Sequence, residues 1–211
     1  LNFFLRRKPA MRINVIDLID KLDHTLIVDH RKDLLKPLRD YIVLKSKQKV
    51  EANLNFICTH NSRRSQFTQV WAKIISDYYG FNINSFSGGT EVTNCNTRTI
   101  SSFERMGFKV KNPAGENPHY ELTYHEKRKP IIVYSKTFDD ISNPKNNFAA
   151  VMTCTNADEN CPIIPGAEKR ISLPFEDPKI FDNSAQESEK YDERSIQIAT
   201  EMKYVFNARL S

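Results

Sequence analysis

The sequence predicts an α/β fold in three layers, with a central parallel four-stranded sheet, helices on both of its faces and a helical N-terminal extension. Two observations predict this class: apolar strands alternate with amphipathic helices from residue 54 onward, and the crossovers between the strands are short. The chain has 211 residues, of which 39% are hydrophobic and 27% charged. This composition is typical of one soluble globular domain.

The individual elements are predicted from the spacing of apolar residues. A helix over 65–79 is expected because Phe67, Val70 and Ile74 recur at three- and four-residue steps until Gly80 ends it. The other predicted elements are strands at 54–57, 83–87, 131–134, 150–153 and around 170–173, and helices at about 98–106 and 188–209.

The chain is predicted to be one domain preceded by an extension. Residues 1–10 precede a methionine and are expected to be upstream or expression-derived sequence. Residues 11–50 are predicted to be a helical extension, with helices over 15–22 and 34–43, that covers the domain or a second subunit. Residues 53–211 have the length of a single catalytic unit.

The excess positive charge lies in the N-terminal part of the chain. Residues 1–50 hold 12 Lys and Arg against 6 Asp and Glu, whereas residues 51–211 hold 19 against 20. Nucleic-acid binding is disfavoured because a nucleic-acid binder concentrates positive charge on its folded core. No stretch approaches 18 uninterrupted apolar residues and no export signal is visible, so the sequence predicts no membrane association and a cytoplasmic location.

Cys58 begins a Cys-x5-Arg-Ser motif between the first predicted strand and the helix that follows it. A loop of this length can turn its backbone N–H groups inward and form an anion nest with the helix N-terminus. The same positive potential favours a Cys58 thiolate, which Ser65 can steady, and Arg64 can grip two oxyanion oxygens. A buried structural Cys58 is the alternative. The expected anion-binding residues are Thr59, His60, Asn61, Ser62, Arg63 and Arg64.

In this motif the chain resembles the low-molecular-weight tyrosine phosphatase fold family, and within it the thioredoxin-coupled arsenate reductases. The resemblance covers about residues 53–210. Beyond the loop it rests on Ser87-Gly88-Gly89-Thr90-Glu91, on the segment from Cys154 to Pro162, and on Phe175-Glu176-Asp177-Pro178.

The reductase resemblance implies a relay of three thiols. Cys58 attacks arsenate, Cys154 attacks Cys58 and expels arsenite, and Cys161 attacks in turn to leave a disulfide that thioredoxin reduces. Asp177 is the implied general acid. The resemblance implies that no cofactor is bound and that thioredoxin acts as an external reductant. Cys154 and Cys161 could instead be buried fillers, and Cys95 has no assigned role.

Two other functions remain open at this point. In a phosphatase of this fold Cys58 attacks phosphorus, Asp177 protonates the leaving oxygen and water hydrolyses the phosphocysteine, so no second thiol is needed. Lys179-Ile180-Phe181 replaces the tyrosines that flank a phenyl ring in related phosphatases, which favours a small oxyanion such as arsenate or phosphate. A non-enzymatic anion sensor is the third possibility. No metal site is predicted, since Gln69 replaces a potassium-binding glutamate and the His residues lack ligand spacing.

Overall fold

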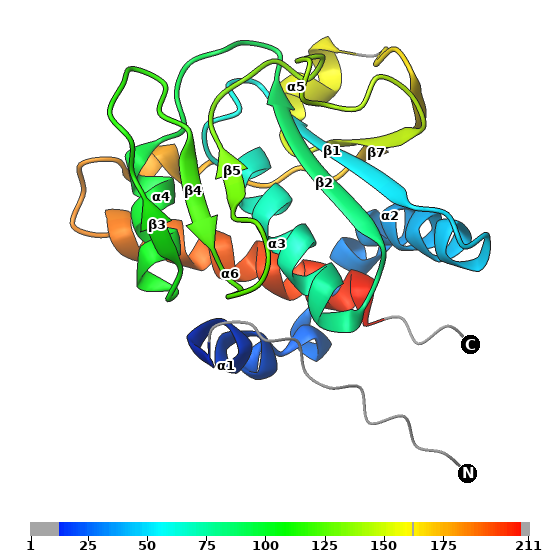
Figure 1. Ribbon diagram of the computed structural model, residues 1–211, viewed down its shortest axis with the longest axis horizontal. Helices are drawn as coiled ribbons and strands as arrows, with labels where there is room; N and C mark the ends of the chain where they lie inside the picture. The colour runs from blue at the N-terminus through cyan, green and yellow to red at the C-terminus, as the bar shows by residue number, and fades with distance from the viewer. Residues whose placement is uncertain (1–12, 162, 208–211) are drawn as a thin grey trace.

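A computed structural model describes residues 13–161 and 163–207; residues 1–10, Pro162 and the end of the last predicted helix lie outside the described residues. The central sheet has four parallel strands in the order β2-β1-β6-β7 (Figure 1). The predicted fold class is therefore confirmed. The strands are β1 (Ala52–Cys58), β2 (Ile83–Gly89), β6 (Phe148–Met152) and β7 (Ala167–Ser172).

Alternate residues of each strand point to opposite faces of the sheet. Both faces are covered, and each contributes to a separate buried cluster. Ala149 and Val151 belong to a large buried cluster, to which the long helices also contribute. Phe148, Ala150 and Met152 belong to a second cluster with α5, which we call the α5-side cluster. The helices on the first face are α1 (Ile13–Lys21), α2 (Asp29–Lys47), α3 (Arg64–Tyr79) and α6 (Glu187–Phe206), and α5 (Thr155–Asn160) covers the second.

The predicted strand near residues 131–134 is present, and it lies in a second sheet beside the central parallel one. β5 (Ile131–Val133) pairs antiparallel with β4 (Tyr120–Thr123), which pairs antiparallel with β3 (Lys109–Lys111). The segment between β4 and β5 is too short for the helical crossover that a parallel connection needs. β3 and β4 were not predicted. The remaining elements are α4 (Thr97–Arg105) and the 3-10 turns η1 (His24–Leu26) and η2 (Pro178–Phe181).

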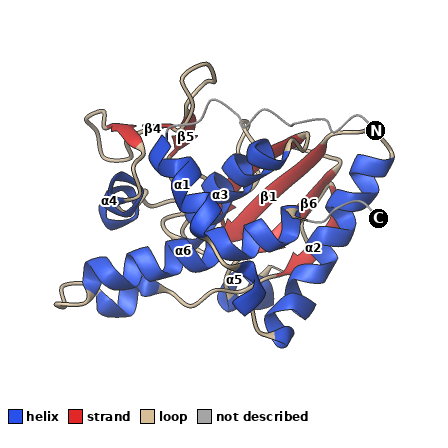
Figure 2. Cartoon of the chain, turned by 90° about the horizontal axis from the view of Figure 1, so that it is seen from below, coloured by secondary structure: helices blue, strands red, loops and turns tan. Residues whose placement is uncertain are grey.

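The N-terminal helices share the core of the sheet domain. Val15 and Ile19 of α1 and Leu35 and Leu38 of α2 are fully buried in the large cluster. α1 lies against α6, and α2 contacts β1, β6, β7 and α6 (Figure 2). α2 begins five residues before the predicted helix over 34–43, because its first turn is polar and carries no apolar repeat, and it ends four residues after that helix. Within the described residues, no helix is long and apolar enough to cross a membrane.

Candidate active site

The anion loop, residues 58–65, joins the carboxyl end of β1 to the N-terminus of α3. β2 ends beside this loop at Gly89, where an added Cβ atom would lie 2.6 Å from the carbonyl oxygen of Thr59 and 2.9 Å from the amide nitrogen of Asn61. Contacts this short are not tolerated, so only glycine allows β2 to approach the loop. Thr90 and Glu91 then donate their backbone N–H groups to the carbonyls of Cys58 and Thr59.

The sulfur of Cys58 is held by two hydrogen bonds inside the loop. Cys58 is the last residue of β1 and is only 3% exposed. The backbone N–H of Asn61 donates to Sγ at 3.2 Å, and Oγ of Ser65 lies 3.0 Å from the same sulfur. These two contacts fix the position of the sulfur inside the loop. Ser65 thus lies where the sequence predicted a thiolate partner.

Asn61 connects the loop to its surroundings through both of its polar groups. Its backbone has a φ of 47°, in the left-handed region that asparagine tolerates. Its amide Nδ2 donates to Oγ of Ser65 at 2.9 Å, and its Oδ1 accepts the backbone N–H of Lys136 at 3.1 Å. Gln66 donates to its carbonyl at 2.9 Å. The roles of Lys136 and Gln66 were not predicted, because sequence spacing does not show which strand end meets the loop.

Arg64 opens α3 and faces the segment that carries Asp177. Its NH1 donates to the carbonyl of Phe175 at 3.1 Å, and its NH2 bonds Oδ2 of Asp177 at 2.9 Å. The preceding residue, Arg63, makes no side-chain capping bond, so the first amides of α3 keep the positive potential of a helix N-terminus. The structure brings the predicted anion clamp and the predicted acid together.

The other predicted anion-loop side chains point in several directions. The Nε of Arg63 donates to the hydroxyl of Tyr191 at 2.7 Å and its NH2 to Asp182 at 3.3 Å, so this guanidinium is held away from solvent. The exposed His60 ring lies 3.5 Å from Glu91. Ser62 is buried, and its carbonyl accepts the N–H of Asn96. His60 and Ser62 therefore contribute backbone groups to the loop.

Cys154 and Cys161 lie at the two ends of α5 and define the relay segment, residues 154–161. Cys154 is the N-cap of α5, is 1% exposed, and its Sγ accepts the N–H of Ala157 at 3.4 Å. The same sulfur lies 3.5 Å from Oγ1 of Thr59, the residue after Cys58. Cys58 and Cys154 both belong to the α5-side cluster, and the half-buried Cys161 packs against it. All four cysteines are free thiols.

Cys95 differs from these three thiols. It belongs to the large cluster on the other face of the sheet, and burial raises its pKa to about 12. Its Sγ lies 3.9 Å from the carbonyl of Ser62. A thiol held in its protonated form is a poor nucleophile, which agrees with giving Cys95 no role. Within residues 13–161 and 163–207, no group of three His, Cys, Asp or Glu side chains could hold a metal ion.

The order of the four parallel strands and the loop between β1 and α3 place the chain in the class of the low-molecular-weight tyrosine phosphatase fold. No protein-family model matches the chain. The chain is 32% identical over 125 residues to arsenate reductase 1 of Staphylococcus saprophyticus, a match that covers 58% of this chain and 76% of that protein. It is 32% identical over 126 residues to the arsenate reductase of Staphylococcus aureus strain Newman, with the same coverage. The chain therefore belongs to the arsenate reductase family.

Two solved structures are also similar to this chain. One is a low molecular weight phosphotyrosine phosphatase from Vibrio cholerae O395, with a TM-score of 0.49 and 16% identity over 73% of this chain and 93% of that one. The other is described as an arsenate reductase in the phosphate binding state, with a TM-score of 0.48 and 17% identity over 76% of this chain and 99% of that one.

Proposed function

We propose that the protein reduces arsenate to arsenite, with Cys58 as the nucleophile and a Cys154–Cys161 disulfide as the oxidised product. The observation that carries this proposal is the grouping of three thiols in and against the α5-side cluster. The Sγ of Cys154 lies 3.5 Å from Oγ1 of Thr59, the residue next to Cys58. A hydrolase needs only Cys58 there. The fourth thiol, Cys95, is kept apart and protonated.

The first step uses the anion loop and the residues that face it. The arsenate oxygens accept bonds from the loop amides, from the N-terminus of α3 and from Arg64, whose NH2 turns from Asp177 to the substrate while its NH1 keeps the Phe175 carbonyl. The Cys58 sulfur, supported by Asn61 and Ser65, attacks arsenic and forms a sulfur–arsenic bond. Asp177 protonates the departing oxygen, which leaves as water.

The second step reduces arsenic. Cys154 loses its proton and attacks the Cys58 sulfur, so that a Cys58–Cys154 disulfide forms and the sulfur–arsenic bond breaks. The electron pair of that bond stays on arsenic, which leaves as arsenite. Cys161 then attacks Cys154, forms the second disulfide and returns Cys58 to its thiolate. Two thiols are oxidised for each arsenate that is reduced.

The final disulfide requires α5 to unwind. Its six helical residues separate the two cysteines by about 10 Å along the axis, at 1.5 Å a residue. A disulfide needs Cα atoms within roughly 7 Å. Asn156 and Asn160 are weak helix formers and are exposed, so the helix itself adds little stability, and α5 is tied to β7 mainly by the bonds of Asp158 to Arg170 and Ser172. Thioredoxin is the proposed external reductant, in the cytoplasm, where such reductants keep thiols reduced.

The test measures arsenite release with a thioredoxin system and aryl-phosphate hydrolysis in parallel. Cys154→Ser and Cys161→Ser are expected to lower multiple-turnover arsenate reduction by at least about 10²-fold and to leave hydrolysis within about twofold. Cys95→Ser is the matched control and should change neither rate. After one equivalent of arsenate, alkylation and peptide mapping should find a Cys154–Cys161 disulfide with Cys58 alkylated. Equal loss of both activities in the two variants would contradict the relay.

Phosphotyrosine or aryl-phosphate hydrolysis is the second candidate function. It is favoured by Asp177, whose Oδ2 lies 2.9 Å from Arg64 and which could protonate an aryl leaving group. Asp177→Asn should slow aryl-phosphate hydrolysis by about 10²-fold. A wild-type protein that hydrolyses aryl phosphates and releases no arsenite would place this function first.

A further inference from the structure

Arg31, at the start of α2, reaches the segment that carries the general acid. Its NH1 donates to the carbonyl of Pro174 at 2.9 Å, and its guanidinium lies over the Phe175 ring, 5.0 Å from the ring centre. Pro174 is 143 positions away in the sequence. The acid segment, residues 173–177, is thus held by a helix of the N-terminal extension as well as by the sheet.

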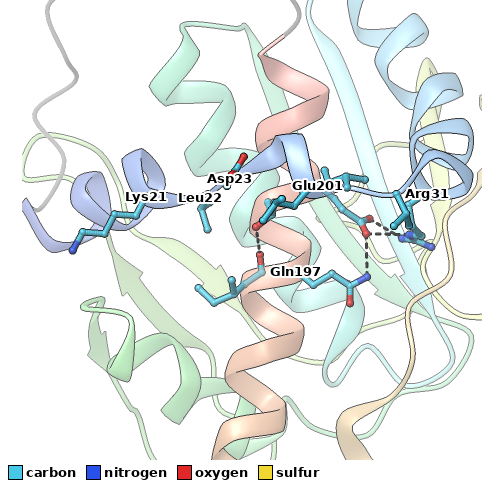
Figure 3. A pocket seen from close by; sticks show the side chains of 11 residues that line it. Lys21, Leu22, Asp23, Arg31, Gln197 and Glu201 are labelled. Atoms are coloured by element: carbon cyan, nitrogen blue, oxygen red, sulfur yellow. Dashed lines mark hydrogen bonds and ion pairs between the residues drawn. The ribbon is translucent and has the colours of Figure 1, made fainter.

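A carboxylate on α6 fixes the orientation of Arg31. Glu201 accepts from Nε at 3.0 Å and from NH2 at 2.7 Å, so the pair is bidentate, and Gln197 donates to the same carboxylate at 3.0 Å. Figure 3 shows these side chains facing one another across the gap between α2 and α6. The Arg31 side chain is 14% exposed and that of Glu201 is 3% exposed. A planar guanidinium held at both ends of its fork has little freedom to turn.

Arg31 and Arg64 bind successive carbonyls of the acid segment. Pro174 accepts from Arg31 and Phe175 accepts from Arg64, whose other nitrogen bonds Asp177. The two arginines therefore hold adjacent carbonyls of one short segment. The N–H of Phe175 bonds the carbonyl of Thr153, next to Cys154.

From this geometry we propose that Arg31 is a positioning residue, which sets the placement of Asp177 and Arg64 through the acid segment. The inference rests on the proposed function, because it assigns Arg31 to the support of that same site. It also assigns a task to the N-terminal extension. Arg31 touches no substrate, so its loss should lower the rate at which the acid works more than it weakens oxyanion binding.

The test uses a variant that removes the contact without leaving a buried charge. Removing one partner of a buried ion pair strands the other charge, whereas replacing both with apolar residues of similar volume is often neutral. Arg31→Met with Glu201→Leu therefore removes the bond to Pro174 and keeps the protein folded. Arg31→Lys is the second variant, because one ammonium cannot serve both Glu201 and Pro174 in this geometry.

Lys203→Met is the matched control. Lys203 also ties α6 to the N-terminal helices, donating to the carbonyls of Ile19 and Leu22 at 2.7 Å. It makes no contact with the acid segment among its bonds in the described structure. A general loosening of the extension would affect this variant as well, whereas a specific effect on the acid would not.

The first readout is leaving-group dependence. In both Arg31 variants kcat for phenyl phosphate should fall about tenfold, while KM should change less than about threefold. The fall in kcat should be smaller for 4-nitrophenyl phosphate, whose leaving group needs less protonation. Lys203→Met should leave the ratio of the kcat values for the two substrates unchanged. A ratio that is also unchanged in both Arg31 variants would overturn the proposal.

The second readout does not need activity. Hydrogen exchange over 173–181 should be at least about fivefold faster in both Arg31 variants than in the wild type, and unchanged in Lys203→Met. Wild-type exchange in the Arg31 variants would overturn the proposal even if activity fell. A wild type that turns over neither arsenate nor aryl phosphate would contradict the proposed function, and the exchange result would then decide separately whether Arg31 holds the segment.

Discussion

The anion loop and the relay segment both place a cysteine at the end of a central strand, and they are built in opposite ways. In the loop, Asn61 and Ser65 bond the Cys58 sulfur and each other, and the backbone N–H groups of the two residues after β2 bond its carbonyls from outside. In the relay segment, six residues of short helix separate Cys154 from Cys161, and most of their side chains are exposed.

This difference follows from what each thiol has to do in the proposed reaction. A nucleophile acts on a bound oxyanion and gains from a fixed geometry, because misplacement by about 1 Å can cost 10²-fold in rate. A relay thiol must reach first Cys58 and then Cys161, so its segment must change shape. Substitutions in the loop should therefore cost far more than substitutions in the relay helix.

The largest effect is expected from Cys58→Ser. Arsenite release and aryl-phosphate hydrolysis should both fall by at least about 10³-fold, because a hydroxyl in the same loop stays protonated and is a weak nucleophile. Both rates should be measured beside Cys95→Ser, which changes an equally buried thiol whose contact with the loop, to the Ser62 carbonyl, a serine can also make. Residual turnover near that of the control would mean that Cys58 is structural.

Asn61→Gly tests whether the loop needs its side-chain bonds or only its backbone shape. Glycine keeps the left-handed conformation but removes the bonds to Ser65 and to the N–H of Lys136. We expect kcat/KM to fall about 10²-fold. The control is Asn147→Gly, an exposed asparagine with a similar φ of 57°. Equal, small effects in the two variants would show that backbone shape suffices.

The local part of this design was predictable from the sequence. The Cys58 motif, the turn at Asn61 and the helix that begins at Arg64 are neighbours in the chain, and short-range spacing determines them. The glycine pair at the end of β2 was recognised only through the family resemblance, and the structure supplies its reason in the approach of Gly89 to the loop.

Long-range contacts were not predictable from periodicity. The bond between Arg31 and the Pro174 carbonyl, and that between Asn61 and Lys136, join elements whose proximity depends on the full topology. β3 was missed because it is three residues long and carries lysines at both ends. The start of α2 was missed because apolar spacing does not report a polar first turn.

The buried side chain of Lys136 makes the stability of the protein depend on pH. Burial lowers the pKa of Lys136 to about 8, against the opposing charge of Asp140. Since the unfolded lysine titrates near 10.5, this group makes unfolding easier at all pH below about 8, and the penalty fades as pH rises from 8 to 10.5.

Lys136→Met should therefore raise the free energy of unfolding by about 2 kcal/mol at pH 7, after allowance for the lost contact of Nζ with the Tyr134 ring. The gain should shrink toward zero by about pH 10.5. Urea unfolding of both proteins at pH 7 and pH 10 measures it. A difference that does not depend on pH would mean that Lys136 is not desolvated in the folded protein.

The smallest effects are expected in the relay helix, where two substitutions at Asn160 should act in opposite directions. Asn160 donates to the carbonyl of Asn156 inside α5. Alanine favours a helix over asparagine by about 0.5 kcal/mol, whereas glycine disfavours it. If α5 must unwind before Cys161 reaches Cys154, Asn160→Ala should slow formation of that disulfide about twofold and Asn160→Gly should hasten it slightly. Rapid quench with alkylation after one equivalent of arsenate measures the step. Identical rates in both variants would show that the thiols meet without unwinding, and the contrast between a rigid loop and a yielding helix would fail.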